Sequence, residues 1–281
     1  MLKEKQEINR IVILTLESFC SGPALTKFIT KYNNRISLVC VSERYGGKYG
    51  SFWQQLKQNF YRSGFTFVNY LSFNLIYYKP FVYIGGFLNK VLGRKKKVYT
   101  IKQLCKKYNI PLIKTLEVKD AETIKQIKSI KPDLIISAYF DHLINQDIID
   151  IPLHGVINIH TAPLPEYRGP FPPLWPALHG KKGGQVTVHY VDDFFDEGDI
   201  IAQKDVEFGK KESILSMDSR FMMVGIDALI DVLDKMERGK IETRTQGEGS
   251  YYSYPNRNDL KNLKKHGVKL YSVKDYIKKF F

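Results

Sequence analysis

The sequence predicts an α/β protein built on an open, mostly parallel, twisted sheet. Two observations carry this prediction. Apolar runs such as IVILTL (11–16) and ISLVCV (36–41) are continuous rather than alternating, which is typical of strands buried on both faces. Segments with helical spacing come between such runs, and strands that alternate with helices form parallel sheets. A chain of 281 residues with 43% hydrophobic and 26% charged residues can bury one large core.

The elements of the first half follow in chain order. A helix is predicted within 18–32, after the first strand, and the segment TIKQLCKKYNIPLI (100–113) predicts a helix, a turn at 109–111 and a short strand. The segment 121–140 predicts a helix and then the strand DLIIS (133–137), and HGVINIH (154–160) predicts the next strand. Each of these strands is expected to join the parallel part of the sheet.

The second half predicts an antiparallel pair and one long helix. The pair is QVTVHYV (185–191) and IIAQKDVEF (200–208). The helix occupies 212–239, with a cap at Ser213 or Ser216 and an end at Gly239. We therefore expect a catalytic domain over 1–240 and a short C-terminal extension over 241–281.

An aromatic-rich segment interrupts the α/β pattern at about 51–98. It has helical character and ends in four consecutive basic residues, Arg94 to Lys97. We expect a helical insertion that packs on the domain or forms a homodimer interface. Contact with a membrane surface is an alternative, because aromatic side chains beside a basic cluster suit that role.

Charge and cysteine usage limit the classes of function. The formal net charge of +14 favours anionic partners, among them nucleic acid, anionic lipid and phosphorylated small molecules. Cys20, Cys40 and Cys105 have no spacing typical of a metal site or of disulfides, so we expect no metal and a reducing, cytoplasmic location. We expect no signal peptide and no transmembrane segment, since no apolar run is long enough to span a bilayer.

Two polar residues stand at the end of an apolar strand in GVINIH. Asn158 and His160 alternate with isoleucines, so both side chains point to the same face of the sheet. The carboxyl end of a parallel strand is where open α/β folds bind ligands. A loop rich in proline follows, and the later segment DDFFDEGDIIAQ (192–203) offers carboxylates. One of these, directed at His160, would orient the imidazole and favour its cationic form.

Taken in order, three motifs resemble those of the folate-dependent formyltransferases. The motifs are NIH (158–160), LPEYRG (164–169) and FFDEGDII (194–201). The resemblance is strong over 132–208 and weaker from residue 10 to about 240, and it implies a Rossmann-like formyltransferase core. It also implies that 10-formyltetrahydrofolate is the co-substrate and that Asn158, His160 and Asp196 are the catalytic residues.

The family's pterin pocket corresponds to two segments of this chain. The resemblance implies that the folate contacts Phe140, Asp141, His142, Leu143, Ile144, Asp193, Phe194 and Phe195. Asp141 and His142 depart from the residues common in relatives, so only backbone contacts are carried over there. We expect the prolines between 163 and 173 to stiffen one wall of the cleft, because proline fixes φ.

The ending of the chain resembles the sugar N-formyltransferase branch, where a YYSYP-like stretch recurs. We therefore expect the acceptor to be the amine of a nucleotide-linked amino sugar, used in surface glycan biosynthesis. Candidate substrate residues are Arg168, Lys95, Lys96, Tyr251 and Tyr252. The methionyl-tRNA branch carries a further C-terminal domain for which residues 240–281 are too few. One alternative is formyl transfer to another amine, that of a non-nucleotide sugar or of methionyl-tRNA, and another is hydrolysis of formyl-folate. A third is a non-enzymatic, basic protein that binds membrane or nucleic acid, although nucleic acid is not expected.

Overall fold

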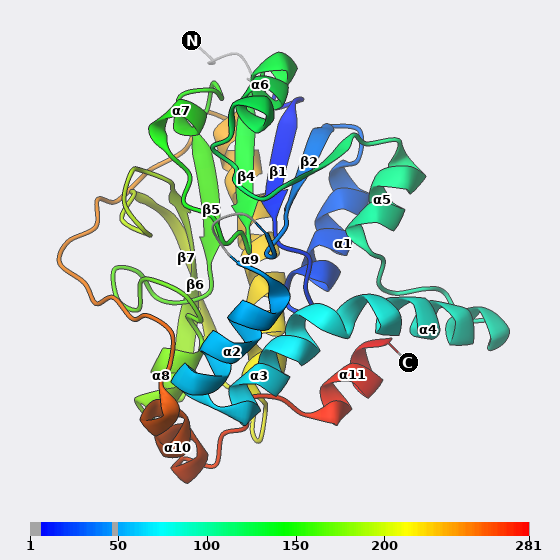
Figure 1. Cartoon of the computed structure of the whole chain (residues 1–281). Helices are drawn as coiled ribbons and strands as arrows, with labels where there is room; N and C mark the ends of the chain where they lie inside the picture. The colour runs from blue at the N-terminus through cyan, green and yellow to red at the C-terminus, as the bar shows by residue number, and fades with distance from the viewer. Residues whose placement is uncertain (1–6, 47–49, 281) are drawn as a thin grey trace.

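The computed structural model describes residues 7–46 and 50–280, and a seven-stranded sheet forms its centre (Figure 1). The strand order is β3-β2-β1-β4-β5-β6-β7. The strands are β1 (Ile11–Thr15), β2 (Ile36–Ser42), β3 (Leu112–Thr115), β4 (Leu134–Ala138), β5 (Val156–His160), β6 (Gly183–Tyr190) and β7 (Ile200–Glu207). The first five strands pair in parallel, and β6 and β7 are antiparallel, which confirms the predicted fold class.

Helices cover both faces of the sheet because its strands are apolar on both sides. One core cluster joins α1 (Ser21–Tyr32), α5 (Ile101–Tyr108) and α9 (Ile214–Glu237) to one face. A smaller cluster joins α6 (Ala121–Ile130) and α7 (Gln146–Ile149) to the other face. The predicted cap of the long helix is confirmed, since the Ser213 side chain accepts a hydrogen bond from the Ser216 N–H.

The predicted insertion is helical and packs on the domain. It consists of α2 (Phe52–Ser63), α3 (Phe65–Leu71), the π-helix η2 (Ser72–Ile76) and α4 (Tyr78–Val91). Capping boxes at Ser51 and Thr100 begin α2 and α5 on either side of it. Phe67, Tyr70 and Tyr78 are fully buried in the larger core. The insertion therefore shares the hydrophobic core of the sheet.

The C-terminal segment returns across the molecule after α9. It carries α10 (Arg257–Lys265) and α11 (Val273–Phe280), and the short α8 (Leu174–Leu178) lies near α10 (Figure 1). The ring of Tyr276 lies 4.7 Å from that of Phe19, centroid to centroid, and both side chains are buried. Residues of 241–281 thus complete the same core, and the boundary at residue 240 stays a prediction.

Candidate functional site

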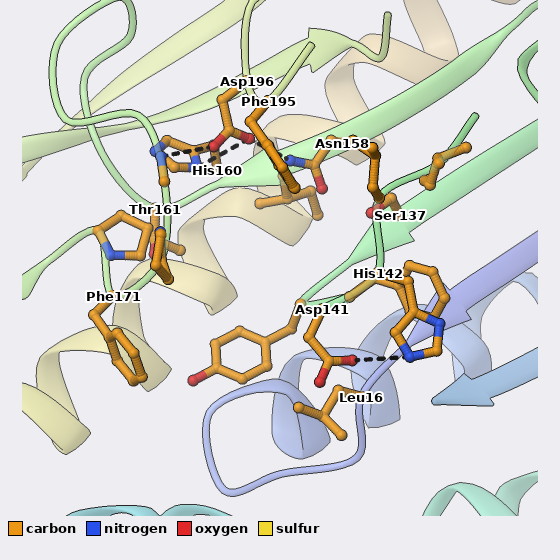
Figure 2. A pocket seen from close by; sticks show the side chains of 18 of the residues that line it. Leu16, Ser137, Asp141, His142, Asn158, His160, Thr161, Phe171, Phe195 and Asp196 are labelled. Carbon is orange, nitrogen blue, oxygen red and sulfur yellow. Dashed lines mark hydrogen bonds and ion pairs between the residues drawn. The ribbon is translucent and has the colours of Figure 1, made fainter. Parts of the chain in front are cut away.

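A pocket of about 340 Å³ opens at the carboxyl ends of β4 and β5 (Figure 2). This is the place where open α/β sheets bind ligands. The loops after β4 and β5 line one side, the loop before β7 lines another, and α3 and η2 of the insertion close a third. Its lining includes Asn158, His160 and Asp196, so the pocket contains all three predicted catalytic side chains.

The side chains of Asn158 and His160 both approach one carboxylate oxygen of Asp196. Asp196 Oδ1 lies 3.5 Å from His160 Nδ1 and accepts a hydrogen bond from Asn158 Nδ2 at 3.4 Å (Figure 2). Asn158 and His160 share one face of β5, and Asp196 reaches them from a loop 36 residues later in the chain. The alternation of side chains along β5 therefore places Asn158 and His160 on one face, as expected. The fold brings Asp196 to them from a distant segment.

The backbone fixes the position of Asp196. Its φ of 57° lies in the left-handed region, which aspartate tolerates better than most residues. Its second oxygen, Oδ2, accepts the Gly169 N–H at 2.9 Å. Gly169 belongs to the proline-rich loop, so that loop holds the carboxylate in addition to walling the cleft. Left-handed non-glycine residues of this kind gather at functional sites.

The partners of His160 assign the roles of its two nitrogens. Nε2 lies 2.9 Å from the carbonyl oxygen of Tyr167, so Nε2 carries a proton and donates it. Nδ1 then faces Asp196. The side chain is 5% exposed and the Asp196 side chain 14%, so water competes little for this contact. Nδ1 is the imidazole nitrogen available for proton movement in the pocket.

His189 is a site residue that sequence reasoning missed. It lies on β6 directly opposite Asn158, and its Nε2 is 3.1 Å from Asn158 Nδ2 and 3.7 Å from Asp196 Oδ1. Nδ1 donates to the carbonyl oxygen of Tyr190 at 2.7 Å, so Nε2 accepts from Asn158. Burial lowers the pKa of His189 to about 4, against the opposing effect of Asp196, so the ring is neutral at pH 7. The available signal was a histidine on the strand after NIH.

Most residues predicted to contact the pterin line the pocket. They are Phe140, Asp141, His142, Leu143, Ile144, Phe194 and Phe195. Asp193 is outside the lining, and Asp192 lies in it instead. The Asp141 carboxylate pairs with Arg44 at 3.3 Å, and His142 Nε2 lies 3.0 Å from the Ser42 hydroxyl. The side chains at 141 and 142 are thus held by the protein, which leaves backbone groups of this loop for a ligand.

A buried polar network joins the insertion to the floor of the pocket. Asn74 of η2 donates to the Tyr139 hydroxyl at 2.8 Å, and Tyr139 donates to Asp218 of α9 at 3.0 Å. The Thr161 hydroxyl donates to the other Asp218 oxygen, also at 3.0 Å. Burial raises the pKa of Asp218. Asn74 sits in a π-helix, a form that often marks functional sites.

The structure brings together only three of the five candidate substrate residues: Arg168 forms a β-bridge with Tyr251, and the Arg168 carbonyl oxygen accepts the Tyr252 N–H at 2.9 Å. Tyr251 lines the pocket, but Tyr252 stacks between Tyr167 and Trp175 outside the lining. Arg168 pairs with Glu197 at 3.2 Å and also lies outside the lining. Lys95 and Lys96 follow α4, away from the lining residues, and Lys96 donates to Gln103. A phosphate role for these cations stays a prediction without support from their positions.

The described residues contain no cluster of three His, Cys, Asp or Glu side chains that could hold a metal ion. Across 7–46 and 50–280, no helix has the length and apolar character needed to cross a bilayer.

Comparison with known families gives a match over residues 89–233 to the model described as Formyl transferase. Among curated proteins, the methionyl-tRNA formyltransferase of Thermodesulfovibrio yellowstonii is 31% identical over 176 residues, or 62% of this chain and 57% of that protein. The corresponding protein of Geobacter sulfurreducens is 31% identical over 156 residues, or 56% of this chain and 49% of that protein. The chain thus spans about half the length of these relatives.

Solved structures show the same fold at low identity. An N-formyltransferase from Helicobacter canadensis, in complex with folinic acid and dTDP-3-aminofucose, has a TM-score of 0.59 at 15% identity and covers 96% of this chain and 82% of its own. A 4-N formyltransferase from Francisella tularensis has a TM-score of 0.52 at 18% identity, with 90% and 78% covered. The phosphoribosylglycinamide formyltransferase of Streptococcus pneumoniae has a TM-score of 0.53 at 14% identity, with 82% and 99% covered.

Proposed function

We propose that this chain, which belongs to the formyltransferase family, uses 10-formyltetrahydrofolate as its formyl donor. The proposed acceptor is the amine of a nucleotide-linked amino sugar. The observation that carries the proposal is the convergence of Asn158, His160 and Asp196 in one pocket at the carboxyl edge of the sheet. An amide, an imidazole and a carboxylate suit acyl transfer to an amine, which needs no covalent nucleophile.

The co-substrate supplies the electrophilic formyl carbon and a nitrogen leaving group. Attack by a neutral amine converts the formyl C=O into an oxyanion, and His160 in its cationic form would donate Nδ1–H to that oxygen. Asp196 Oδ1, 3.5 Å from His160 Nδ1, would stabilise the imidazolium and accept the proton that the amine gives up. The oxyanion then re-forms a C=O bond, the carbon–nitrogen bond to the folate breaks, and the folate nitrogen takes the proton that Asp196 accepted from the amine. Asn158 orients Asp196, because Asn158 Nδ2 donates to it.

The pterin is proposed to lie against the loop 140–144 and beside 192–195. Phe140 and Phe194 line the pocket from these two segments, and the backbone of 140–144 borders it. Aromatic rings and main-chain amides together suit a flat heterocycle with polar edges. Phe194 is 67% exposed, so its ring is available to cover a bound ligand.

The loop after β1 favours a sugar nucleotide over phosphoribosylglycinamide, the acceptor in the name of the Streptococcus pneumoniae relative. The N–H groups of Phe19 and Cys20, at the start of α1, donate to Asn74 of the insertion at 2.7 and 3.3 Å. A side chain built at Gly22 would meet the Tyr78 hydroxyl oxygen at 1.9 Å. These contacts occupy the place where a helix N-terminus could hold phosphate. The acceptor would enter beside Phe171 and Tyr251 instead, which line the pocket.

The structural relatives bound to dTDP and to dTDP-3-aminofucose add support at the level of fold. Methionyl-tRNA formyltransferases are the relatives by sequence, so an aminoacyl-tRNA acceptor is the competing proposal. A role in glycan biosynthesis follows only if the acceptor is an amino sugar. Homodimerisation through 51–98 stays a prediction.

The test is an acceptor panel. The protein is incubated with 10-formyltetrahydrofolate and, in turn, nucleotide-linked amino sugars, free amino sugars, methionyl-tRNA or no acceptor. Release of tetrahydrofolate and the product mass are measured. We expect turnover only with a nucleotide-linked amino sugar, whose mass rises by one carbonyl group. Formate released without an acceptor would identify a hydrolase, and formylated methionyl-tRNA would replace the sugar proposal.

A further inference from the structure

The segment 44–116, which contains the insertion, carries the whole net charge of the chain. Residues 44–116 contain 14 lysines and arginines and not one aspartate or glutamate. The chain holds 43 basic and 29 acidic residues in total, so the rest of it has 29 of each and is neutral. A positive charge confined to one segment indicates that this segment binds an anionic partner. A charge that served only to keep the protein soluble would be spread over the whole surface.

Helix α4 is apolar on two sides. Tyr78, Val82, Gly85 and Asn89 are buried against the protein, and Asn89 donates to the carbonyl oxygen of Phe280 at 2.9 Å. This side needs no further partner. A helix with one satisfied apolar side ordinarily turns polar residues to water on the other.

The outer side of α4 is apolar instead. Ile84, Phe87, Leu88 and Val91 repeat at i, i+3, i+4 and i+7, and they form what we call the α4 stripe. All four are exposed, with Phe87 at 67% and Val91 at 66%. The neighbouring helix α11 adds Val273 and Ile277, which are also exposed and lie four residues apart; these two are not counted in the α4 stripe.

Basic side chains flank the α4 stripe. Lys90 is exposed within α4, and Arg94, Lys95 and Lys97 are exposed directly after it. Lys96 lies back along the helix, since its Nζ would be 3.1 Å from a side chain built at Gly86. Lys274 and Lys278 are exposed on α11 (Figure 1 shows α11 beside α4). These cations lie outside the pocket lining, so the pocket does not explain them.

We propose that α4 docks on an anionic lipid bilayer, with the α4 stripe in the headgroup and acyl boundary and the flanking lysines and arginines on the lipid phosphates and carboxylates. At 14 residues, α4 is about 21 Å long, too short to span, which suits a helix lying in the plane of the interface. An apolar stripe with cations beside it is the pattern of such helices.

A second copy of this chain fits the same face less well. Self-association through the α4 stripe would bring two segments of the same positive charge together, with no acid within 44–116 of either copy to compensate. Like charges at an interface are unfavourable, whereas an anionic bilayer complements them. Charge therefore selects the bilayer.

The test is sedimentation of the full chain with vesicles of phosphatidylcholine alone and of phosphatidylcholine mixed with phosphatidylserine. We expect binding to the mixed vesicles only, and less of it at high salt. The triple variant Ile84→Ser/Phe87→Ser/Val91→Ser keeps every charge, and we expect its apparent affinity to fall at least about tenfold. Leu153→Ser is the matched control, because Leu153 is 71% exposed but lies outside the insertion, and it should bind like the wild type.

A charge variant separates the electrostatic contribution to vesicle binding from the apolar contribution. Lys90→Glu/Lys97→Glu should weaken binding by about tenfold or more, whereas Lys125→Glu/Lys128→Glu, on exposed positions of α6, should not. Formyl transfer in solution is measured for each variant, and unchanged turnover shows that the variants fold. The proposal is overturned if mixed vesicles leave the wild type in the supernatant, or if the triple variant binds as the wild type does. A wild-type dimer that the triple variant dissociates, without vesicle binding, would assign the face to a second copy.

Discussion

His189 accepts a hydrogen bond from Asn158 across the β5–β6 pair, with 3.1 Å between His189 Nε2 and Asn158 Nδ2. The amide nitrogen of Asn158 also donates to Asp196. One neutral histidine thereby sets the orientation of the amide, and the amide helps to set that of the carboxylate. His189 is a positioning residue that acts through its two neighbours.

Removing this acceptor should lower turnover without abolishing the fold. In His189→Leu the Asn158 N–H loses its partner, so we expect kcat to fall by roughly tenfold, equivalent to about 1.4 kcal/mol, with KM for the amine little changed. His189→Gln offers an amide oxygen in nearly the same place and should recover most of the loss. Equal loss in both variants would indicate a packing role only.

The same histidine predicts a pH dependence of stability. Its pKa is about 4 when folded and near 6.5 when unfolded, so the unfolded state binds more protons between these values. The free energy of unfolding should therefore fall by up to roughly 3 kcal/mol as pH drops from 6.5 to 4. The difference in this pH dependence between the wild type and His189→Gln isolates the contribution. Parallel curves from urea unfolding would contradict it.

The catalytic residues themselves predict a larger effect. Asp196→Asn keeps the shape and tolerates the left-handed backbone, but it cannot accept the amine's proton or stabilise a cationic His160. His160→Ala removes the proposed oxyanion donor. We expect kcat/KM to fall by about 10²–10³ in each, with the thermal midpoint retained for Asp196→Asn. Near-full turnover in either variant would remove that residue from its proposed role.

Gly169 links the proline-rich loop to the catalytic carboxylate. Its φ is 98°, and a side chain there would lie 2.3 Å from the carbonyl oxygen of Tyr252. Gly169→Ala should therefore displace the N–H that Asp196 accepts and lower kcat by at least about tenfold. Gly180→Ala is the control, because Gly180 has a φ of 71° but open space around it. It should cost only about 1 kcal/mol of stability, with kcat unchanged.

The network under the pocket predicts a stability effect. Tyr139→Phe removes the hydroxyl that joins Asn74 to the buried Asp218, so both partners lose a hydrogen bond. We expect a loss of about 1–3 kcal/mol in urea unfolding. Tyr83→Phe serves as control, because Tyr83 is 53% exposed, and it should be nearly neutral. A neutral Tyr139→Phe would show that the network contributes nothing to the fold.

The sequence predicted what depends on local pattern. Apolar runs located the strands, and alternation placed Asn158 and His160 on one face of β5. His189, Tyr139 and Asp218 were missed because their roles arise from contacts between distant segments, which periodicity does not encode. The ion pair between Arg168 and Glu197 could not be predicted from the motif either, and a role of Arg168 toward the substrate stays a prediction.

The contacts of the insertion could not be predicted from the sequence either. Its helical character was readable from 51–98, but the pattern did not say that Leu71 and Asn74 would close the pocket. Nor did it separate the buried side of α4 from the exposed one, because both are apolar. Only the fold distinguishes the side that meets the core from the side that faces outward.

The central claim is that Asn158, His160 and Asp196 converge on the formyl carbon of a folate. It is tested most directly by a crystal structure with 5-formyltetrahydrofolate. We predict the pterin against the backbone of 140–144 and the formyl group within hydrogen-bond distance of His160 or Asn158, on the side that Asp196 faces. A pterin bound elsewhere, or a formyl group turned away from these three side chains, would contradict the account.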